Sequence, residues 1–443
     1  MNINELQQII YNAGIVGAGG AGFPTHKKIS EKVETIIVNA VECEPLLKVD
    51  RHLVVEYLNE AVQALKILID ALNAGKAYIA LKSKNIKYLK NIDELSLKTS
   101  KVEIKEIPDI YPAGDEVVLT YEVTGKIVPE GNIPLSVGVM VINIETLFNI
   151  YKALNGSPVT YKYVTVTGEV DEPVTLCVPV GTPVKKLLAF AGFYDTIGYT
   201  VVMGGPLMGS ICDPQKEVVT KTTKGIIVLP ANHPLIQKKK IKASVAYKRA
   251  SSACCQCRMC TDMCPRYLLG YSIEVHKTVR SVANEITTDA APYLQSHLCS
   301  ACGVCDYIAC TQDIIPRTIC SEVKNQMIKN NLRYTNGKAP QKVRNERQYR
   351  LLPSQRIIER CGLKKYDIES KTVEMPLVVP EVRIPLKQHI GKPATPVVKV
   401  GEQVKQGQLI AQVAYEDLGA NIHSSINGMV YEINDKEIII IKN

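Results

Sequence analysis

The stretch CCQCRMCTDMCP, residues 254–265, decides the character of the central part of the chain. Four of its five cysteines, all but Cys255, follow the order C-x2-C-x2-C-x3-C-P, a spacing typical of the four-iron clusters of bacterial ferredoxins. Three cysteines on a tight loop can reach three corners of an iron–sulfur cube, and the fourth enters from a chain that has turned away. A zinc site would use two CxxC pairs and would leave thiols without a role. The spacing therefore predicts a [4Fe-4S] cluster.

A second cysteine group reads C-x2-C-x2-C-x4-C over residues 299–310. Its last gap is one residue longer and Thr311 replaces the proline, so Cys320 is an alternative to Cys310 as the fourth ligand. In two-cluster ferredoxins the fourth cysteine of each group binds the other cluster. We therefore expect two clusters, one on Cys254, Cys257, Cys260 and Cys310 and one on Cys299, Cys302, Cys305 and Cys264. Because no iron is left open for a substrate, the clusters are expected to carry single electrons.

The overall composition excludes several classes of protein. With 443 residues, of which 46% are hydrophobic and 22% charged, the chain is expected to form several ordinary globular domains. Ten of its 14 cysteines lie between residues 254 and 320, which favours metal ligands in a reducing cytoplasm over disulfides. No secretory signal and no membrane-spanning apolar run is visible. The net charge of +9 is not arranged as a basic stripe interleaved with aromatic residues, so nucleic-acid binding is not favoured.

The pattern of apolar residues predicts a multidomain α/β chain. In the first third, strands at 35–39, 77–81 and 102–107 alternate with helices at 52–73 and about 84–95, which predicts a parallel sheet covered on both faces. The expected organisation is an α/β domain at 1–155, a small α+β module at 158–212, a linker at 213–245 that holds a strand at 225–229, a helical cysteine domain at 246–335, a linker at 336–375 and a β-domain at 376–443.

A glycine-rich segment lies near the N-terminus, from Gly17 to Gly22. It formally matches the dinucleotide fingerprint G-x-G-x-x-G, and Glu42 stands where a ribose-binding acid would be. That fingerprint requires a preceding strand, but residues 4–12 have the pattern of an amphipathic helix. A Rossmann site and a purely structural turn therefore remain alternatives. We favour a phosphate-cradling loop of another architecture, assisted by Lys27, Lys28 and a helix that starts near Thr25.

Several motifs together resemble one superfamily of redox proteins. The resemblance is to the FMN- and NADH-binding subunit of respiratory complex I and, more closely, to RnfC and the PduS-like cobalamin reductases. It rests on GAGGAGFPTHKK (17–28), NAVECEP (39–45), YPAGDE (111–116) and NIETL (143–147). The 158–212 module, which runs into MGGPLMG (203–209), resembles an SLBB β-grasp domain. Residues 384–432 resemble the barrel-sandwich hybrid module of RnfC, and their place after the cysteines is the PduS-like order.

The resemblance implies a set of cofactors and binding residues. FMN would be bound without a covalent link, and NADH would be the substrate. By matched position, the FMN phosphate and ribityl chain would lie among Gly17, Gly19, Gly20, Gly22 and Lys28. The flavin or the nicotinamide would be lined by Asn39, Glu42, Tyr111, Gly114, Asp115, Glu116 and Asn143, and Phe23 would stack on the dinucleotide. Hydride transfer to a flavin requires no catalytic side chain, so none is predicted.

The implied fold class is a multidomain α/β protein with an FMN-binding α/β domain, an SLBB β-grasp module, an α-helical two-cluster ferredoxin domain and a C-terminal barrel-sandwich hybrid β-domain. The barrel-sandwich module has no lysine within residues 414–424, where a carrier hairpin would present one, so no swinging-arm cofactor is expected.

The implied function is electron transfer from NADH to FMN, to two [4Fe-4S] clusters and then to cob(II)alamin, in support of a B12-dependent diol dehydratase. The expected partners are cobalamin or its enzymes and a shell protein, and the expected location is the cytoplasm, within a bacterial microcompartment. One alternative is an RnfC-like subunit that passes electrons between NADH and ferredoxin at a membrane complex. Another is a non-enzymatic electron conduit or scaffold.

Overall fold

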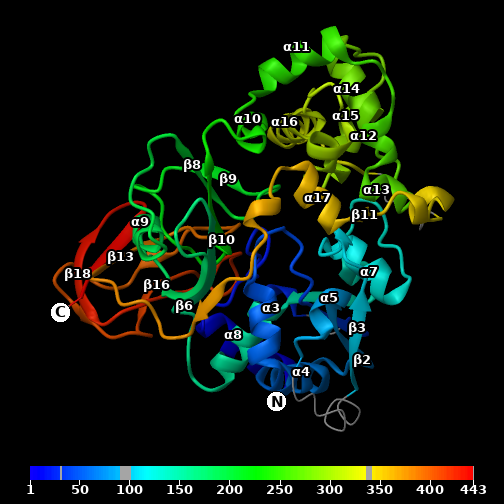
Figure 1. Ribbon diagram of the computed structural model, residues 1–443. Coiled ribbons are helices and arrows are strands. Elements are labelled where there is room, and N and C mark those ends of the chain that lie inside the picture. The colour runs from blue at the N-terminus through cyan, green and yellow to red at the C-terminus, as the bar shows by residue number, and fades with distance from the viewer. Residues whose placement is uncertain (30–31, 90–100, 336–341, 443) are drawn as a thin grey trace.

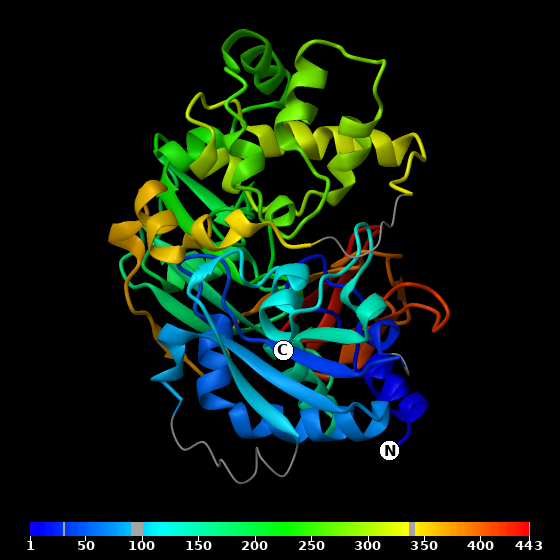
Figure 2. The same ribbon diagram turned by 90° about the vertical axis from the view of Figure 1, so that its right-hand side faces the viewer.

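The computed structural model describes residues 1–29, 32–89, 101–335 and 342–442. Figure 1 shows an N-terminal α/β part, a mixed sheet, a helical part and a C-terminal β part. In both Figure 1 and Figure 2 the helical part lies at the end of the molecule opposite the N-terminus. Within the described ranges, no helix combines the length and the apolar character needed to cross a membrane.

A parallel four-stranded sheet forms the centre of the N-terminal α/β part. Its order is β3-β2-β1-β5, with bounds β1 (Thr35–Asn39), β2 (Lys76–Lys82), β3 (Val102–Ile107) and β5 (Val139–Asn143). The predicted strands at 35–39, 77–81 and 102–107 are confirmed. Strands β1 and β5 pair in register from Thr35 opposite Val139 to Asn39 opposite Asn143. Two asparagines therefore end neighbouring strands at the carboxyl edge of the sheet.

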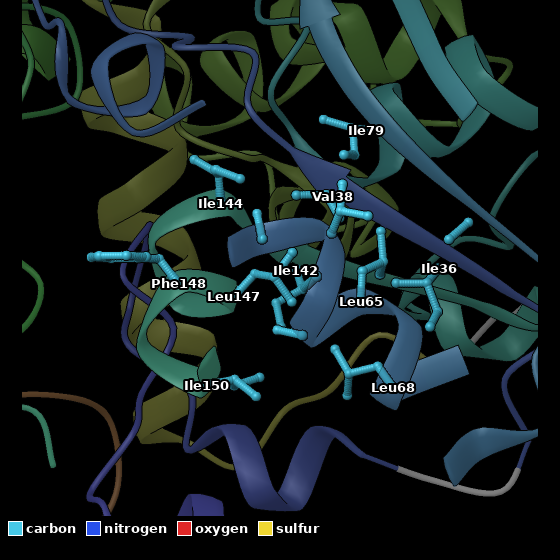
Figure 3. Close-up of a cluster of buried hydrophobic side chains, with 14 of the residues drawn as sticks. Ile36, Val38, Leu65, Leu68, Ile79, Ile142, Ile144, Leu147, Phe148 and Ile150 are labelled. Atoms are coloured by element: carbon cyan, nitrogen blue, oxygen red, sulfur yellow. The ribbon is translucent and has the colours of Figure 1, made fainter. Parts of the chain in front are cut away.

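Helices cover both faces of this sheet, as predicted. Ile36 and Val38 of β1 pack on α4 and α8, as Figure 3 shows, whereas Ile37 lies in a second buried cluster with Leu119 of α7. The run of buried β-branched residues in β1 is typical of a strand covered on both faces. The helices of this part are α1 (Ile3–Asn12), α2 (Thr25–Lys28), α3 (Val49–Glu56), α4 (Leu58–Leu72), α5 (Ser83–Ile86), α7 (Glu116–Thr124) and α8 (Ile144–Leu154).

The prediction of one long helix over 52–73 is wrong. The chain forms α3 and α4 instead, with Tyr57 between them at φ −121° and ψ 30°. The Tyr57 hydroxyl lies 3.2 Å from that of Tyr163 and donates to Glu374 Oε2 at 2.7 Å. The break thus allows Tyr57 to contact the neighbouring sheet. The helix predicted at about 84–95 is represented by α5 alone, and its residues 90–95 lie outside the described residues.

The middle of the chain forms a mixed six-stranded sheet in the order β12-β7-β6-β10-β8-β9. Its strands are β6 (Tyr161–Gly168), β7 (Val174–Pro179), β8 (Tyr199–Met203), β9 (Ser210–Cys212), β10 (Gly225–Pro230) and β12 (Lys371–Val373), and α9 (Val184–Phe190) packs against them. The segments 213–245 and 336–375, expected as linkers, therefore supply β10, which lies between β6 and β8, and the edge strand β12.

Residues 246–335, here called the cluster segment, are largely helical, as predicted. They follow α10 (Pro234–Lys239) and begin within α11 (Ala243–Ala253). They contain α12 (Met259–Asp262), α13 (Pro265–Leu268), α14 (Val275–Ala283), α15 (Ala291–Leu294) and α16 (Pro316–Lys329). The chain then returns to the α/β part, where β11 (Leu352–Pro353) pairs with β4 (Ile110–Tyr111) and α17 (Ser354–Arg360) follows. In Figure 1, β11 and α17 lie between the cluster segment and the α/β part.

The C-terminal β part consists of two small sheets, in the orders β13-β19-β18-β15 and β14-β16-β17. Their alternating strands enclose one buried cluster of apolar side chains. The strands are β13 (Glu381–Pro385), β14 (Thr395–Pro396), β15 (Gln403–Val404), β16 (Leu409–Gln412), β17 (Ile422–His423), β18 (Gly428–Ile433) and β19 (Glu437–Ile441).

Candidate functional site

The glycine-rich segment leaves a short stretch of backbone open beside the N-terminus of α8. Ala18 N–H donates to Thr146 Oγ1 of α8 at 2.9 Å. Among the described residues, none accepts a hydrogen bond from the N–H groups of Gly19, Gly20 or Ala21, and all three residues are exposed. A Cβ at Gly20 would meet no atom within 4 Å. An open row of N–H groups at a helix N-terminus suits an anion, so this loop fits the phosphate of FMN.

The flanking residues refine this picture of the loop. The helix expected near Thr25 is α2, a single turn, so the longer α8 is the helix whose N-terminus meets the loop. Gly17 N–H donates to Phe23 O at 2.9 Å and closes the loop, and the Phe23 side chain is 38% exposed. Lys28 Nζ donates to Glu116 Oε1 at 2.8 Å, which brings α7 to the loop.

Two of the predicted flavin residues, Asn39 and Asn143, lie side by side at the carboxyl edge of the parallel sheet. Asn143 Nδ2 donates to Asp50 Oδ1 at 3.1 Å, and its Oδ1 accepts from Glu145 N–H at 3.0 Å, which caps α8. Asn39 Nδ2 donates to Gly114 O at 3.0 Å. In open α/β sheets this edge is where ligands bind, and the two amides bring the motifs of β1, β5 and α7 to one place.

Glu42 belongs to a buried group of charges. Its Oε2 accepts N–H bonds from Asp50 and Arg51 at the start of α3. Asp50 is paired with Lys224, which comes from the segment before β10. Burial, and then the charge of Asp50, raises the pKa of Glu42 to about 7. This carboxyl therefore changes its protonation near neutral pH, and it is held by backbone donors.

Tyr111 connects the α/β part to the second cysteine group. The side chain is buried, and its hydroxyl donates to Cys302 O at 2.6 Å. The same hydroxyl lies 3.0 Å from Glu44 Oε1, while Glu44 Oε2 accepts the N–H of Leu207 at 2.8 Å. A Cβ at Gly205 would lie 2.1 Å from Glu44 Oε2, so the MGGPLMG loop needs glycine there to close over this carboxyl.

Asp115 makes a second connection to the cluster segment. Its Oδ1 accepts the N–H groups of Val117 and Val118 and so caps α7. Both of its oxygens also accept from Arg266 Nη2 at 2.8 Å. Arg266 lies two residues after Cys264, so Asp115 is directed toward the cysteines and not toward the open stretch of the glycine loop.

The C-terminal β part packs against the glycine-rich segment. Ile390 N–H donates to Ala21 O at 3.1 Å, and a Cβ at Gly22, which has φ +71°, would lie 2.8 Å from His389 Cβ. Behind the loop, buried Lys221 donates to Gly14 O at 2.7 Å and to Asn421 O at 2.6 Å. Burial lowers the pKa of Lys221 to about 7. Three parts of the chain therefore meet directly behind the glycine-rich segment.

The cysteines of the cluster segment have other cysteine thiols as neighbours, which contribute to their pKa shifts. Burial, and then the neighbouring thiols of Cys310, Cys254 and Cys257, raises the pKa of Cys260 to about 12. Burial likewise raises the pKa of Cys302, with Cys264 and Cys299 as its neighbouring thiols. Cys305 has Cys299 and Cys302 as neighbouring thiols, and Cys320 is hydrogen-bonded to Cys299.

Each group offers four thiols and so fits a cubane. Within the described ranges, no three His, Cys, Asp or Glu side chains converge on a point that would suit one metal ion. The four thiolates of a cubane lie farther apart than the ligands of a single metal ion, because each of the four iron atoms binds one thiolate.

The two cysteine loops share one backbone conformation. Gln256 and Ala301, each directly before the middle cysteine, both have φ of +56°, and Arg258 and Gly303, directly after it, have φ of +65° and +82°. The longer last gap of the second group is taken up by a π-helical turn over Cys305–Ala309, closed by Cys310 N–H to Cys305 O at 3.0 Å. A π turn accommodates one residue more than an α turn, so Cys310 can occupy the position that Cys264 has in the first group.

Sequence reasoning missed several residues of this site. Thr146 and Glu44 lie inside the quoted motifs, so their hydrogen-bonding side chains were visible there. Asp50, Lys224 and Arg266 lie outside the motifs, and no local pattern marks them, since their roles arise only where distant segments meet.

Comparison with known families gives the same division of the chain. Matches are found to the family models of the Nuo51 FMN-binding domain over residues 10–152, the SLBB domain over 163–210, a 4Fe-4S dicluster domain over 253–315 and the RnfC barrel sandwich hybrid domain over 361–442. The FMN-binding, SLBB, iron–sulfur and barrel-sandwich assignments are thereby confirmed. The fold and the site define a flavin- and iron–sulfur-dependent electron-transfer oxidoreductase.

Curated relatives narrow this class to one family. The cobalamin reductase PduS of Salmonella typhimurium is 39% identical over 444 residues, covering 100% of this chain and 97% of that protein. The cobalamin reductase PduS of Citrobacter freundii is 38% identical over 99% of this chain and 96% of its own length. The chain belongs to the PduS family. Among solved structures, the NAD+-reducing [NiFe]-hydrogenase in the H2-reduced state has a TM-score of 0.49 and 19% identity, over 76% of this chain and 64% of that one.

Proposed function

We propose that the protein transfers electrons from NADH, through FMN and two [4Fe-4S] clusters, to cob(II)alamin. The observation that carries the proposal is that one chain of the PduS family combines an open glycine loop with two groups of four cysteines. FMN supplies the needed chemistry when bound, because it accepts a hydride and returns electrons singly. The balance is that one NADH and two cob(II)alamin give NAD+, one proton and two cob(I)alamin.

In this proposal the chain binds and orients its cofactors. The N–H groups of Gly19, Gly20 and Ala21 hold the FMN phosphate, and Lys28 adds a positive charge at the end of the loop. Asn39 and Asn143 orient the ring system at the sheet edge. One cluster is bound by Cys254, Cys257, Cys260 and Cys310 and the other by Cys299, Cys302, Cys305 and Cys264.

The other predicted residues shape the cofactor site or hold its elements in position. Gly17 and Gly22 shape the loop, Gly114 packs against Cys43, and Glu42 and Tyr111 are held at the sheet edge by hydrogen bonds. Phe23 is the exposed ring available for stacking on NADH. Asp115 and Glu116 position α7 through Arg266 and Lys28.

The first experiment is composition and turnover. Protein purified without oxygen should contain about one FMN and eight irons per chain, and NADH should reduce cob(II)alamin, followed by its absorption spectrum. A preparation with no flavin, or with markedly fewer than eight irons, would contradict the proposal.

The phosphate loop can be tested with a matched pair of glycines. Gly20 and Gly125 have φ of +69° and +71°, and a Cβ at either would meet no atom within 4 Å, so the same substitution strains both equally. Gly20→Asp places a carboxylate among the phosphate-binding N–H groups and should weaken FMN binding at least tenfold, measured by flavin fluorescence. Gly125→Asp, at the end of α7, should leave it within twofold. Equal flavin affinity in the two variants would argue against the loop.

From the resemblance to PduS-like proteins we place this reaction inside a bacterial microcompartment, where it supports a B12-dependent diol dehydratase and contacts a shell protein. Co-purification of the chain with assembled shells from its native cells tests this. Recovery of the chain entirely apart from the shells would contradict it.

A further inference from the structure

The two cysteine loops differ sharply in exposure. In the first, Cys255, Gln256, Cys257, Arg258 and Met259 are exposed in succession, and Met259 is 43% exposed. Among the described residues, this loop forms hydrogen bonds only with other residues of the cluster segment. In Figure 1 helix α11, which precedes this loop, lies at the end of the helical part farthest from the N-terminus. The first loop is thus open to a partner.

The later part of the second loop is enclosed and contacts the α/β part, whereas Cys299, Ser300 and Ala301 line an open cavity of about 400 Å³. Cys302, Gly303 and Val304 are buried, and Cys302 and Val304 share one apolar cluster with Leu46 and Tyr111. The Tyr111 hydroxyl donates to the Cys302 carbonyl, so a residue of the candidate flavin site is hydrogen-bonded directly to a cysteine of this loop.

Arg266 extends the same contact. The two hydrogen bonds from its Nη2 to the Asp115 carboxylate fix the chain just after Cys264, the cysteine assigned to the cluster of the second loop. The geometry therefore places that cluster beside the flavin domain and the cluster of the first loop on the solvent side. Electron transfer slows steeply with distance, so these positions determine the order of transfer.

We propose that electrons enter the cluster segment at the Cys299–Cys305 loop and leave at the Cys254–Cys260 loop, over which cob(II)alamin docks. The inference rests on the proposed function and adds a direction to it: flavin, buried-loop cluster, exposed-loop cluster, corrinoid. Each cluster passes one electron at a time, so the two electrons of one NADH reduce two cob(II)alamin in succession.

The exit surface can be tested with two arginine substitutions on exposed apolar residues of the cluster segment. Met259→Arg places a long charged side chain on the first loop, whereas Ile328→Arg, at a residue 55% exposed on α16, adds the same charge to the cluster segment outside either loop. Met259→Arg should slow electron transfer to cob(II)alamin about tenfold, and Ile328→Arg should stay within twofold. In both variants NADH should still reduce the flavin and both clusters, measured by electron paramagnetic resonance without acceptor. Equal rates of cob(II)alamin reduction in the two variants would overturn the exit assignment.

The entry side is tested by the clusters that NADH can reduce. In Cys257→Ser, NADH should still reduce the buried-loop cluster, although transfer to cob(II)alamin is lost. In Cys302→Ser, NADH should reduce the flavin only, while dithionite still reduces the exposed-loop cluster. Iron analysis establishes first that each variant retains its other cluster. Tyr111→Phe keeps all eight cysteines and should slow reduction of the clusters by NADH with no change in their reduction by dithionite.

The outcomes separate the two proposals. If NADH reduces no flavin in the wild-type protein, the proposed function fails and this inference fails with it. If the wild-type protein reduces cob(II)alamin but the results for Cys257→Ser and Cys302→Ser are exchanged, the proposed function stands and the direction is overturned.

Discussion

The two cysteine loops have the same local design and different surroundings. Both place left-handed residues on either side of the middle cysteine, and each sends its fourth thiol toward the other group. Yet Cys257 is exposed, whereas Cys302 is 9% exposed and contacts the α/β part through Tyr111.

The cysteine spacing determines the local fold of each loop, but it does not determine which loop faces the flavin domain and which faces solvent. The spacing fixes the local fold, because a cube requires thiolates from a tight turn. The role of each loop depends on what packs against it, namely solvent for the first and the flavin domain for the second. The following substitutions test how far this difference in surroundings extends into stability.

The largest effect is expected at the ion pair beneath the second loop. Asp306 is fully buried and pairs with Arg317, whose Nε lies 3.1 Å from Asp306 Oδ2. Arg317→Met would leave a buried carboxylate without its partner and should cost about 3–5 kcal/mol. The measurement is the urea concentration at which the iron–sulfur absorption is lost under anaerobic conditions.

The matched change in the first loop is Arg258→Met. Arg258 is paired with Asp262 at 3.4 Å, but its side chain is 46% exposed. Exposed ion pairs contribute about 0–1 kcal/mol, so this variant should have nearly the wild-type urea midpoint. Similar losses in the two variants would show that the loops do not differ in enclosure.

A smaller effect is expected where the cluster segment joins the flavin domain. Arg266→Gln removes the two hydrogen bonds from Nη2 to the Asp115 carboxylate, and both side chains are largely buried. Hydrogen bonds to charged groups contribute about 1.5–3 kcal/mol, so a loss of about 2 kcal/mol is expected by the same urea measurement. The control is Lys277→Gln, which removes an exposed pair with Glu274 on α14 and should change stability by less than about 1 kcal/mol. If Arg266→Gln loses no more stability than the control, Arg266 does not stabilise the contact between the cluster segment and the flavin domain.

Most of the local structure of these loops could be predicted from the sequence, but their surroundings could not. The cysteine spacing and the apolar runs of β1 and β2 are local patterns, and the structure confirms the strands. The contact of Tyr111 with Cys302 joins residues 191 positions apart, which no periodicity records. The π turn after Cys305 explains the longer gap that made Cys310 uncertain, because it absorbs one residue without displacing the thiol.

Contacts between residues far apart in the sequence also explain why the bounds of one helix and the place of one strand were predicted wrongly. The break at Tyr57 leaves an apolar pattern that still reads as one helix, because the reason for the break is a contact with Tyr163 and Glu374 far along the chain. Strand β10 was visible as an apolar run, but its central place between β6 and β8 depends on pairing across more than 20 residues of intervening chain. Glu42 and Asn143 were found through motifs, whereas their partner Asp50 has no motif of its own.

A still smaller effect is expected at Gly303, directly after the middle cysteine of the second loop. Its φ of +82° suits glycine, and a Cβ there would lie 3.0 Å from two ring carbons of Tyr307. Gly303→Ala should therefore cost about 1–2 kcal/mol, from the left-handed backbone alone, with the tight contact adding to it. Retention of the wild-type urea midpoint would mean that the second loop can shift its neighbours and is less enclosed than its burial indicates.

The smallest effect, of opposite sign, is expected at the equivalent position of the first loop. Arg258 adopts φ of +65° at a place where nothing requires a large side chain except its exposed contacts with Asp262 and Tyr267. Glycine accepts this conformation without steric cost, so Arg258→Gly should change stability by between about 0 and 1 kcal/mol in the stabilising direction. Met259→Gly, at the next residue and the first position of α12, provides the control, because its backbone is not left-handed and glycine there relieves no steric strain, so this variant should not be stabilised. A clear loss of stability in Arg258→Gly would show that the arginine holds the first loop in place, and that this loop is more than a solvent-facing copy of the second.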